Sequence, residues 1–390
     1  MLIYNARLVL EHEILHGSMR IQDGRIAKIS GDDIVPERQE LTLDADGAYV
    51  MPGVVDLHTH GAGGFDFMDG AVSDIINAAA ALARHGTTTC LPTTLTSSDD
   101  DLFRFLRNFK EAVANESDDV VARMPGVHLE GPYFDMVEKG AQDPRYIRQP
   151  TKSHYSKILE IADGSILRWS LAPELEGSME LIDTLSERGI LVSGAHTAAT
   201  YADVKQACEH GMRLLTHFYS GMSTITRHGG FRVLGAVESG YLIDDLYVEL
   251  ISDGMHLPPE LLELIFKCKP HDRITVCSDS MRGAGSADGP SILGPKNNGT
   301  AVVIEDGIAK MPDRTCFAGS VATGDRLIRT LHTVLGLELD EIARIASLQP
   351  ARLIGMDQEI GSIAVGKKAD LVIYDDDITI QNVFIDGKCV

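Results

Sequence analysis

The chain has 390 residues, of which 44% are hydrophobic and 24% charged, and its formal net charge is −22 at pH 7. These values are typical of a globular protein with one large domain and a small satellite. The negative charge argues against nucleic-acid and anionic-membrane partners, and no run of 18 apolar residues exists to cross a membrane. We therefore expect a small molecule as the partner.

The N-terminal sequence does not have the pattern of a secretory signal peptide. MLIYNARLVLEHEILHG lacks a basic segment followed by a long apolar core, so no signal peptide is expected. The six cysteines are scattered and form no CxxC motif, which is typical of free thiols. Together these features predict a cytoplasmic protein.

The two ends of the chain have the alternating pattern of short strands. Asp-Gly pairs at residues 23–24 and 386–387 separate such runs and predict tight hairpin turns. We expect residues 1–50 and 357–390 to meet in a small β domain.

Between these ends, apolar β-rich runs alternate with helical stretches. The runs lie at about 50–57, 86–92, 124–129, 166–172, 190–195, 213–218, 246–252 and 273–278. This alternation predicts parallel strands buried on both faces, and eight is the number of strands that closes a (β/α)8 barrel. We predict a TIM-type barrel for residues 51–356, with a doubly wound open sheet as the alternative.

Chemistry in such barrels occurs at the carboxyl ends of the strands. Histidines and carboxylates lie at or just beyond six of the predicted strand ends: His58, His60, His128, Glu130, His196, His217, His256 and Asp279. Imidazole and carboxylate groups bind zinc and iron, so this pattern predicts a divalent metal site.

Other roles compete at single positions. His128 lies one layer deeper than Glu130, and we expect it to be a hydrogen-bonded core histidine. Asp279 could cap the following segment, and His256 could begin a helix. For Glu130, His196 and His217 the metal interpretation is strongest, because an isolated buried charge is costly.

Three nitrogen or oxygen ligands with an open position describe a catalytic metal. Glu130, His196 and His217 would hold one ion, and the two histidines at residues 58–60 would hold a second or orient the first. Asp279 would take a proton from the activated water and return it to the leaving nitrogen. The pattern therefore predicts hydrolysis of an amide or related C–N bond.

The motifs PGVVDLHTHGAGGFDFMD, GVHLEGPYF, SGAHTAAT, THFYSGMS, SDGMHLPPELL, FAGSVATGDRLIRTL and GSIAVGKKADLVIYD occur in this order. The chain resembles the amidohydrolase superfamily and, more narrowly, its N-acetylglucosamine-6-phosphate deacetylases, over nearly its whole length. The resemblance implies a β-sandwich built from both termini. It also implies hydrolysis of the N-acetyl group of an amino-sugar 6-phosphate, with one or two ions, zinc or iron.

The resemblance also implies roles for single residues. Glu130, His196 and His217 would bind metal, Asp279 would be the catalytic acid and base, and His256 would contact the sugar phosphate. Some relatives lack the HxH pair and use one metal, whereas His58 and His60 here allow two.

The resemblance further implies that backbone amides near Ser220 and Gly221 and an arginine from a neighbouring subunit bind the phosphate. Arg227 is the nearest candidate and Arg232 the second, which implies a homodimer. Basic residues of the loops after 124–129 and 213–218 support an anionic substrate, or are solvated loop charges: Lys139, Arg145, Arg148, Arg227, His228 and Arg232.

The chain departs from the family pattern in three places: two substrate-binding motifs, and a segment after 213–218 where TRHGGFR replaces an HREPG-like stretch. Ser220-Gly221-Met222 replaces Asn-Ala-Met, and Gln142 replaces a histidine that contacts substrate; glutamine forms hydrogen bonds but cannot titrate. These departures leave open a galactosamine epimer or an unphosphorylated sugar. The insertion at 283–310 is long enough to cover the site as a lid, or it decorates the rim.

Rival functions fit the sequence less well. Hydantoinase- and dihydroorotase-like enzymes use a carboxylated lysine, which ILRWSLAPE lacks, and the His-Ala-Glu signature of nucleoside deaminases is absent. A sugar-phosphate-binding barrel without turnover is the remaining alternative, and the presence of Asp279 argues against it.

Overall fold

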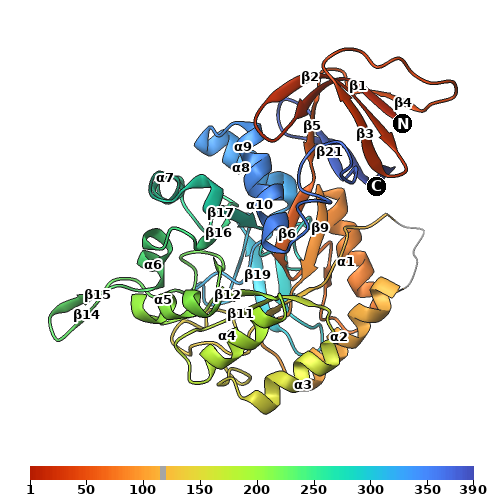
Figure 1. Ribbon diagram of the computed structural model, residues 1–390. Helices are drawn as coiled ribbons and strands as arrows, with labels where there is room; N and C mark the ends of the chain where they lie inside the picture. Colours follow the sequence, from red (N-terminus) through yellow and green to blue (C-terminus); the bar gives the residue numbers. More distant parts are fainter. Residues whose placement is uncertain (115–119) are drawn as a thin grey trace.

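A computed structural model describes residues 1–114 and 120–390 (Figure 1). Strands from both chain ends form one sheet, at the top of the view. These strands are β1 (Leu2–Val9), β2 (Ile14–Gln22), β3 (Arg25–Ser30), β4 (Thr42–Asp44), β5 (Tyr49–Pro52), β21 (Leu371–Tyr374), β22 (Ile380–Ile385) and β23 (Lys388–Cys389). Their order is β23-β22-β21-β5-β1-β2-β3, with β4 paired to β1, so the antiparallel pair of β5 and β21 joins the two ends.

Both predicted Asp-Gly turns are present in this sheet. Asp23 and Gly24 connect β2 to β3 with φ of 50° and 74°, and Asp386 and Gly387 connect β22 to β23 with φ of 48° and 70°. Two successive positive φ values are what a two-residue type I′ hairpin requires, which explains the choice of these residues. The two hairpin predictions are confirmed.

The middle of the chain forms parallel sheet. One sheet has the order β10-β11-β12-β13-β16-β17, and β6 pairs with β9 in a second. The strands are β6 (Val54–Thr59), β9 (Thr87–Pro92), β10 (Val127–Glu130), β11 (Ile166–Leu171), β12 (Leu191–Gly194), β13 (Leu214–Leu215), β16 (Tyr247–Ile251) and β17 (Ile274–Cys277). Each overlaps one of the predicted apolar runs, and every described pairing among them is parallel. The predicted strand positions and direction are confirmed.

Single parallel bridges link the two sheets. Thr93 next to β9 pairs with His128 on β10, and Thr59 on β6 pairs with Ser280 beyond β17. The amide of Asp279 also donates to the carbonyl of His58 at 2.9 Å. These links bring the carboxyl ends of β6 and β17 together.

Helices follow most of these strands. They are α1 (Val72–Arg84), α2 (Asp99–Ala114), α3 (Lys152–Ala162), α4 (Ser178–Glu187), α5 (Tyr201–His210), α6 (Ala236–Leu242), α7 (Pro259–Cys268), α8 (Gly324–Leu335), α9 (Leu339–Ala343) and α10 (Gln349–Leu353), with short turns η1 (His271–Arg273) and η2 (Arg344–Leu348). Helix α5 shows how the sequence sets the bounds: the Asp203 carboxylate accepts from the amide of Thr200 at 2.8 Å, and Gly211 ends the helix with φ of 121°. Such capping satisfies backbone groups that a helix end leaves free.

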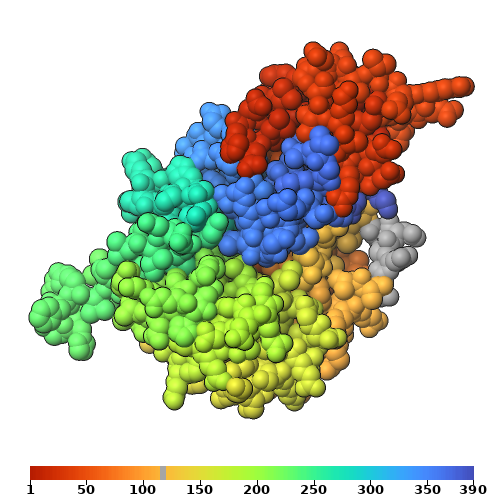
Figure 2. Space-filling model, in the orientation of Figure 1, coloured from red at the N-terminus to blue at the C-terminus, as the bar shows by residue number. Residues whose placement is uncertain are grey.

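Three further small antiparallel sheets are present in the described residues. The insertion contains β18 (Gly289–Leu293), β19 (Thr300–Glu305) and β20 (Ile308–Lys310) in one antiparallel sheet. The pair β14 (Thr226–His228) and β15 (Phe231–Val233) projects away from the body, as Figures 1 and 2 show at the left. The short pair β7 (Gly61–Ala62) and β8 (Phe65–Asp66) follows β6. No helix in the described residues is long and apolar enough to cross a membrane.

Candidate active site

Side chains from several strand ends converge on one point. His58 lies on β6 and His60 directly follows it, and their Nε2 atoms lie 3.2 Å apart. Asp279 follows β17, and its Oδ1 lies 3.4 Å from Nε2 of His58 and 3.2 Å from Nε2 of His60. All three side chains are buried. The strand periodicity that predicted a common direction for the two histidines is confirmed.

Glu130, at the end of β10, connects this group to a second one. Its Oε1 lies 3.1 Å from Nε2 of His217 and 3.3 Å from Nε2 of His196. Its Oε2 lies 3.5 Å from Nε2 of His60. One carboxylate thus faces imidazoles from both sides of the site.

The outer nitrogens of two imidazoles are held by backbone carbonyls. Nδ1 of His196 donates to the carbonyl of Glu138 at 2.8 Å, and Nδ1 of His60 donates to that of Thr93 at 3.3 Å. Such bonds fix the tautomer and leave the Nε2 lone pair facing inward. Gly221 is required beside His196, because its φ is +57° and an added Cβ would lie 2.8 Å from Nδ1 of that ring.

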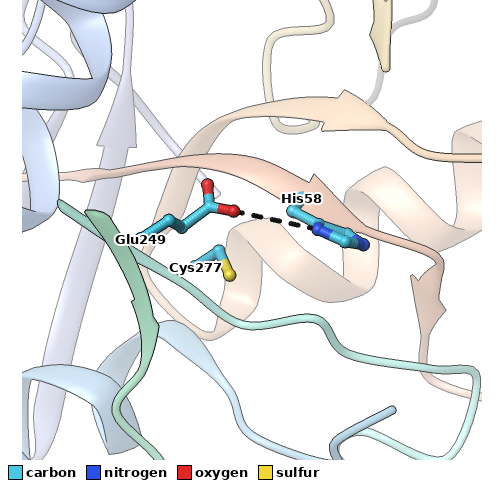
Figure 3. Close-up of side chains that lie close together, drawn as sticks. All are labelled: His58, Glu249 and Cys277. Atoms are coloured by element: carbon cyan, nitrogen blue, oxygen red, sulfur yellow. Dashed lines mark ion pairs between the residues drawn. The ribbon is translucent and has the colours of Figure 1, made fainter. Parts of the chain in front are cut away.

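His58 has a different neighbour on its outer side. Its Nδ1 faces Oε2 of Glu249 on β16 at 3.9 Å, and Figure 3 shows this ion pair beside Cys277. Both Glu249 oxygens also accept from the Arg168 guanidinium, at 2.6 and 2.7 Å. Burial raises the pKa of the Cys277 thiol well above its usual range. The Glu249 carboxylate of this cluster is therefore already engaged by Arg168.

The backbone at three site residues has left-handed conformation. The φ angles are 45° at His196, 32° at His217 and 46° at Asp279. Residues other than glycine are uncommon in this region, although Asn, Asp and His enter it more often than the rest, and such residues cluster at functional sites. Each of the three lies two residues beyond its strand, where this turn occurs.

The two carboxylates of the site remain ionised. Burial alone would raise the pKa of Glu130, but His58, His196 and His217 outweigh burial and hold it well below its usual range. Burial likewise opposes ionisation of Asp279, and the neighbouring His58 and His60 lower its pKa. Ionised carboxylates can bind a cation or accept a proton.

A cavity of about 220 Å³ opens onto this group of residues. The lining residues are His60, Leu95, Glu130, Gly140, Ala141, Gln142, His196, His217, Ser220, Gly221, His256, Asp279, Leu293, Cys316, Phe317 and Gly319. Leu293 belongs to β18, so the insertion supplies part of the wall. The lining contains no lysine or arginine among the described residues.

Comparisons with known proteins identify the family. A model described as "Amidohydrolase family" matches residues 49–390. The chain belongs to the amidohydrolase family. It is 33% identical over 380 residues to the N-acetylglucosamine-6-phosphate deacetylase of Bacillus subtilis (strain 168), which covers 97% of this chain and 93% of the relative. It is 31% identical over 371 residues to the N-acetylgalactosamine-6-phosphate deacetylase of Escherichia coli O157:H7, covering 95% and 93%.

A solved structure agrees with these sequence relatives. A mutant N-acetyl-D-glucosamine-6-phosphate deacetylase from Mycobacterium smegmatis, in complex with N-acetyl-D-glucosamine-6-phosphate, superposes with a TM-score of 0.88. The match covers 100% of this chain and 98% of that structure, at 27% identity. The overall fold is therefore that of an amidohydrolase.

The amidohydrolase family implies a divalent metal ion, and the donors present here fit one. His58, His60 and Asp279 form one group with ligand atoms close together, and His58, Glu130 and His217 form another. The two nitrogens of His217 differ in their surroundings. Nε2 faces Glu130, whereas Nδ1 is buried without a hydrogen-bond partner in the described structure. Nitrogen and oxygen donors of this kind suit zinc and iron.

The predicted substrate-binding residues lie in different surroundings. Gln142, Ser220, Gly221 and His256 line the cavity, whereas Arg227 lies on the projecting β14–β15 hairpin. The amide of Ser220 already donates to the carbonyl of His217 at 2.9 Å. A phosphate contact from Ser220 would therefore use its hydroxyl.

His128 is the core histidine that its depth predicted. It is fully buried, with Nε2 at 2.7 Å from Oγ of Ser170 and Nδ1 at 3.3 Å from Oγ1 of Thr93. Burial and the neighbouring Arg168 lower its pKa well below the usual range, so the ring is neutral. Its ring packs edge to face against that of His58, with the ring centroids 4.7 Å apart.

Sequence reasoning missed three supporting residues. Arg168 and Glu249 form a buried pair under His58, and Asp253 accepts from Nδ1 of His256 at 2.8 Å. The signal for the pair was available, because each is a lone charge within an apolar strand, ILRWSL and YVELI. Asp253 precedes His256 by three residues, a spacing that allows a local hydrogen bond.

Proposed function

We propose that this amidohydrolase removes the N-acetyl group of an amino-sugar 6-phosphate, with N-acetylglucosamine 6-phosphate as the substrate. The observation that carries the proposal is the position of Asp279. Its Oδ1 lies beside the inward nitrogens of His58 and His60 and on the wall of the cavity. The relatives named above, with 33% and 31% identity, are deacetylases of acetylated amino-sugar phosphates.

Glu130, His196 and His217 would hold one divalent ion, zinc or iron, and His58 and His60 would hold a second or orient the first. When bound, a divalent ion lowers the pKa of water and polarises a carbonyl oxygen. The ring orientations set by Glu138 and Thr93 keep the nitrogens of His196 and His60 directed inward.

Asp279 performs the proton transfers. Its ionised carboxylate accepts a proton from the attacking water while the new C–O bond forms at the acetyl carbon. It then delivers that proton to the sugar nitrogen as the C–N bond breaks. The products are acetate and the free amino sugar phosphate, and Asp279 returns to its ionised state.

The phosphate needs a positive partner that the cavity wall does not supply from lysine or arginine in the described residues. We propose a homodimer in which Arg227, or Arg232, reaches the site of a second copy. Both lie on the exposed hairpin that projects from the body (Figure 2). His256, oriented by Asp253, and the Ser220–Gly221 turn would complete phosphate and sugar binding.

For the fold, we propose that the two parallel sheets form one closed (β/α)8 barrel within residues 51–356. The bridges from Thr93 to His128 and from Thr59 to Ser280 support closure. Residues 1–50 and 357–390 would form the small β-sandwich domain, supported by their shared sheet. The six free cysteines support a cytoplasmic location.

The test is acetate release from N-acetylglucosamine 6-phosphate by purified protein with added zinc or ferrous iron, beside an Asp279→Asn control. We expect release by the parent and none by the variant. The galactosamine epimer and the unphosphorylated sugar are run in parallel, because one relative is named for the galactosamine substrate. Faster turnover of the epimer would reassign the substrate, and metal binding without turnover of any of them would favour a sugar-phosphate-binding barrel.

A further inference from the structure

Gln142 lies between the loop after β9 and the end of β10, and both ends of its side chain are engaged. Its Oε1 accepts from the amide of Thr96 at 2.9 Å, and its Nε2 donates to Oε2 of Glu130 at 2.7 Å. The residue is only 5% exposed. The backbone amide of Thr96 is a donor only, so it requires the oxygen of Gln142 and places the amide nitrogen on Glu130.

This contact determines how Glu130 presents its two oxygens. Oε1 faces the nitrogens of His196 and His217, whereas Oε2 is bound by Gln142. Rotation of the carboxylate away from this orientation would break a charge-assisted hydrogen bond, which is among the stronger kinds. Gln142 is in turn held by the main-chain amide of Thr96. It therefore links the loop after β9 to the Glu130 carboxylate.

We propose that Gln142 is a positioning residue for the metal-binding carboxylate of Glu130, rather than mainly a contact to the substrate. The proposal rests on the proposed function for the role of Glu130 as a ligand. A hydrogen-bond partner behind a metal ligand orients it, and losing such a partner typically lowers metal affinity or activity about 10–100-fold.

The two roles predict different measurements. A positioning role predicts that Gln142→Met weakens metal binding by about 10–100-fold and lowers kcat, with KM changed little. A substrate contact predicts raised KM with unchanged metal binding. Methionine is similar in length to glutamine and removes both hydrogen bonds.

The experiment uses the full-length protein with Zn²⁺ as the probe. Competition with a chelator of known affinity gives the zinc affinity of the parent, Gln142→Met and Gln142→Glu, without any substrate. Glutamate keeps an acceptor for Thr96 but replaces the donor to Glu130 with a second carboxylate, so its zinc affinity should also change. Ser220→Ala is the matched control on the same wall, and we expect parental zinc affinity from it.

Steady-state kinetics of the same variants complete the test. Parental zinc affinity in both Gln142 variants overturns the proposal, whatever the kinetics show. If the methionine variant does not fold, as judged by circular dichroism, the glutamate variant decides by the same criterion. If the parent hydrolyses no acetylated sugar phosphate, the proposed function fails, whereas the zinc titration still decides the link between Gln142 and Glu130.

Discussion

The buried Arg168–Glu249 pair predicts a large effect on the free energy of unfolding. Both side chains are fully buried. The five N–H donors of Arg168 are all used: two on Glu249, and one each on Ser193, Leu57 and Thr216. Replacing Glu249 with glutamine leaves a buried guanidinium without its counter-charge.

Removing one partner of such a pair costs about 3–5 kcal/mol of unfolding free energy, because the remaining charge is uncompensated. We expect Glu249→Gln and Arg168→Met each to lose this amount. The double variant Arg168→Met, Glu249→Gln should lose clearly less than the sum of the two, because no unpaired charge remains.

Guanidinium denaturation measures these differences. Trp169 is the only tryptophan, is fully buried and is adjacent to Arg168, so its fluorescence reports on this layer. Circular dichroism supplies a probe of the whole chain. Losses that add within about 0.5 kcal/mol in the double variant would refute the argument, because additivity means that the two residues do not interact.

Three further outcomes follow from the site and its surroundings. Asp279→Asn should keep the fold and bound metal but lower kcat by at least about 10²–10⁴-fold, measured as acetate release; near-parental turnover would remove Asp279 from the proton transfers. Chelation of the parent should abolish activity and lower Tm, and added zinc or ferrous iron should restore both; activity that survives full metal removal, checked by elemental analysis, would contradict a metal role. Burial would raise the pKa of Asp325, but contacts with His85, Thr323 and Arg329 lower it to about 2. Since this folded-state pKa is below the unfolded value, its contribution of about 2 kcal/mol is present above about pH 4 and lost as the pH falls toward 2. The free energy of unfolding of Asp325→Asn should therefore be lower than that of the parent at pH 7, and the difference should narrow toward pH 3. A difference that stays constant with pH would contradict a lowered pKa of Asp325 in the folded protein.

The positions of the candidate ligands were predictable because they depend on strand period and strand ends. Alternation along one strand assigns His58 and His60 to the same face, and Glu130 lies at the end of another strand. The ends of parallel strands meet at one edge, so residues far apart in the chain, such as His196 and Asp279, were expected together.

The supporting contacts were not predictable in the same way. Gln142 lies in a loop, and nothing in its neighbourhood in sequence specifies Thr96 and Glu130 as partners. Its reach depends on the path of two loops, which carry no periodicity. The length of the β14–β15 projection is likewise a tertiary feature, since TRHGGFR shows a turn but not where the hairpin points.

The distribution of charge ties these observations together. A chain with a net charge of −22 repels an anionic substrate, so positive charge must be local. In the described structure the Arg168 guanidinium is paired with Glu249 inside the protein, and the cavity wall presents the carboxylates of Glu130 and Asp279 without lysine or arginine. One divalent ion would only balance these two carboxylates, and an excess of positive charge would require a second ion, His256 or the hairpin of a neighbouring copy. Metal loading and assembly, rather than the cavity wall alone, should therefore decide how strongly this site favours a phosphorylated sugar.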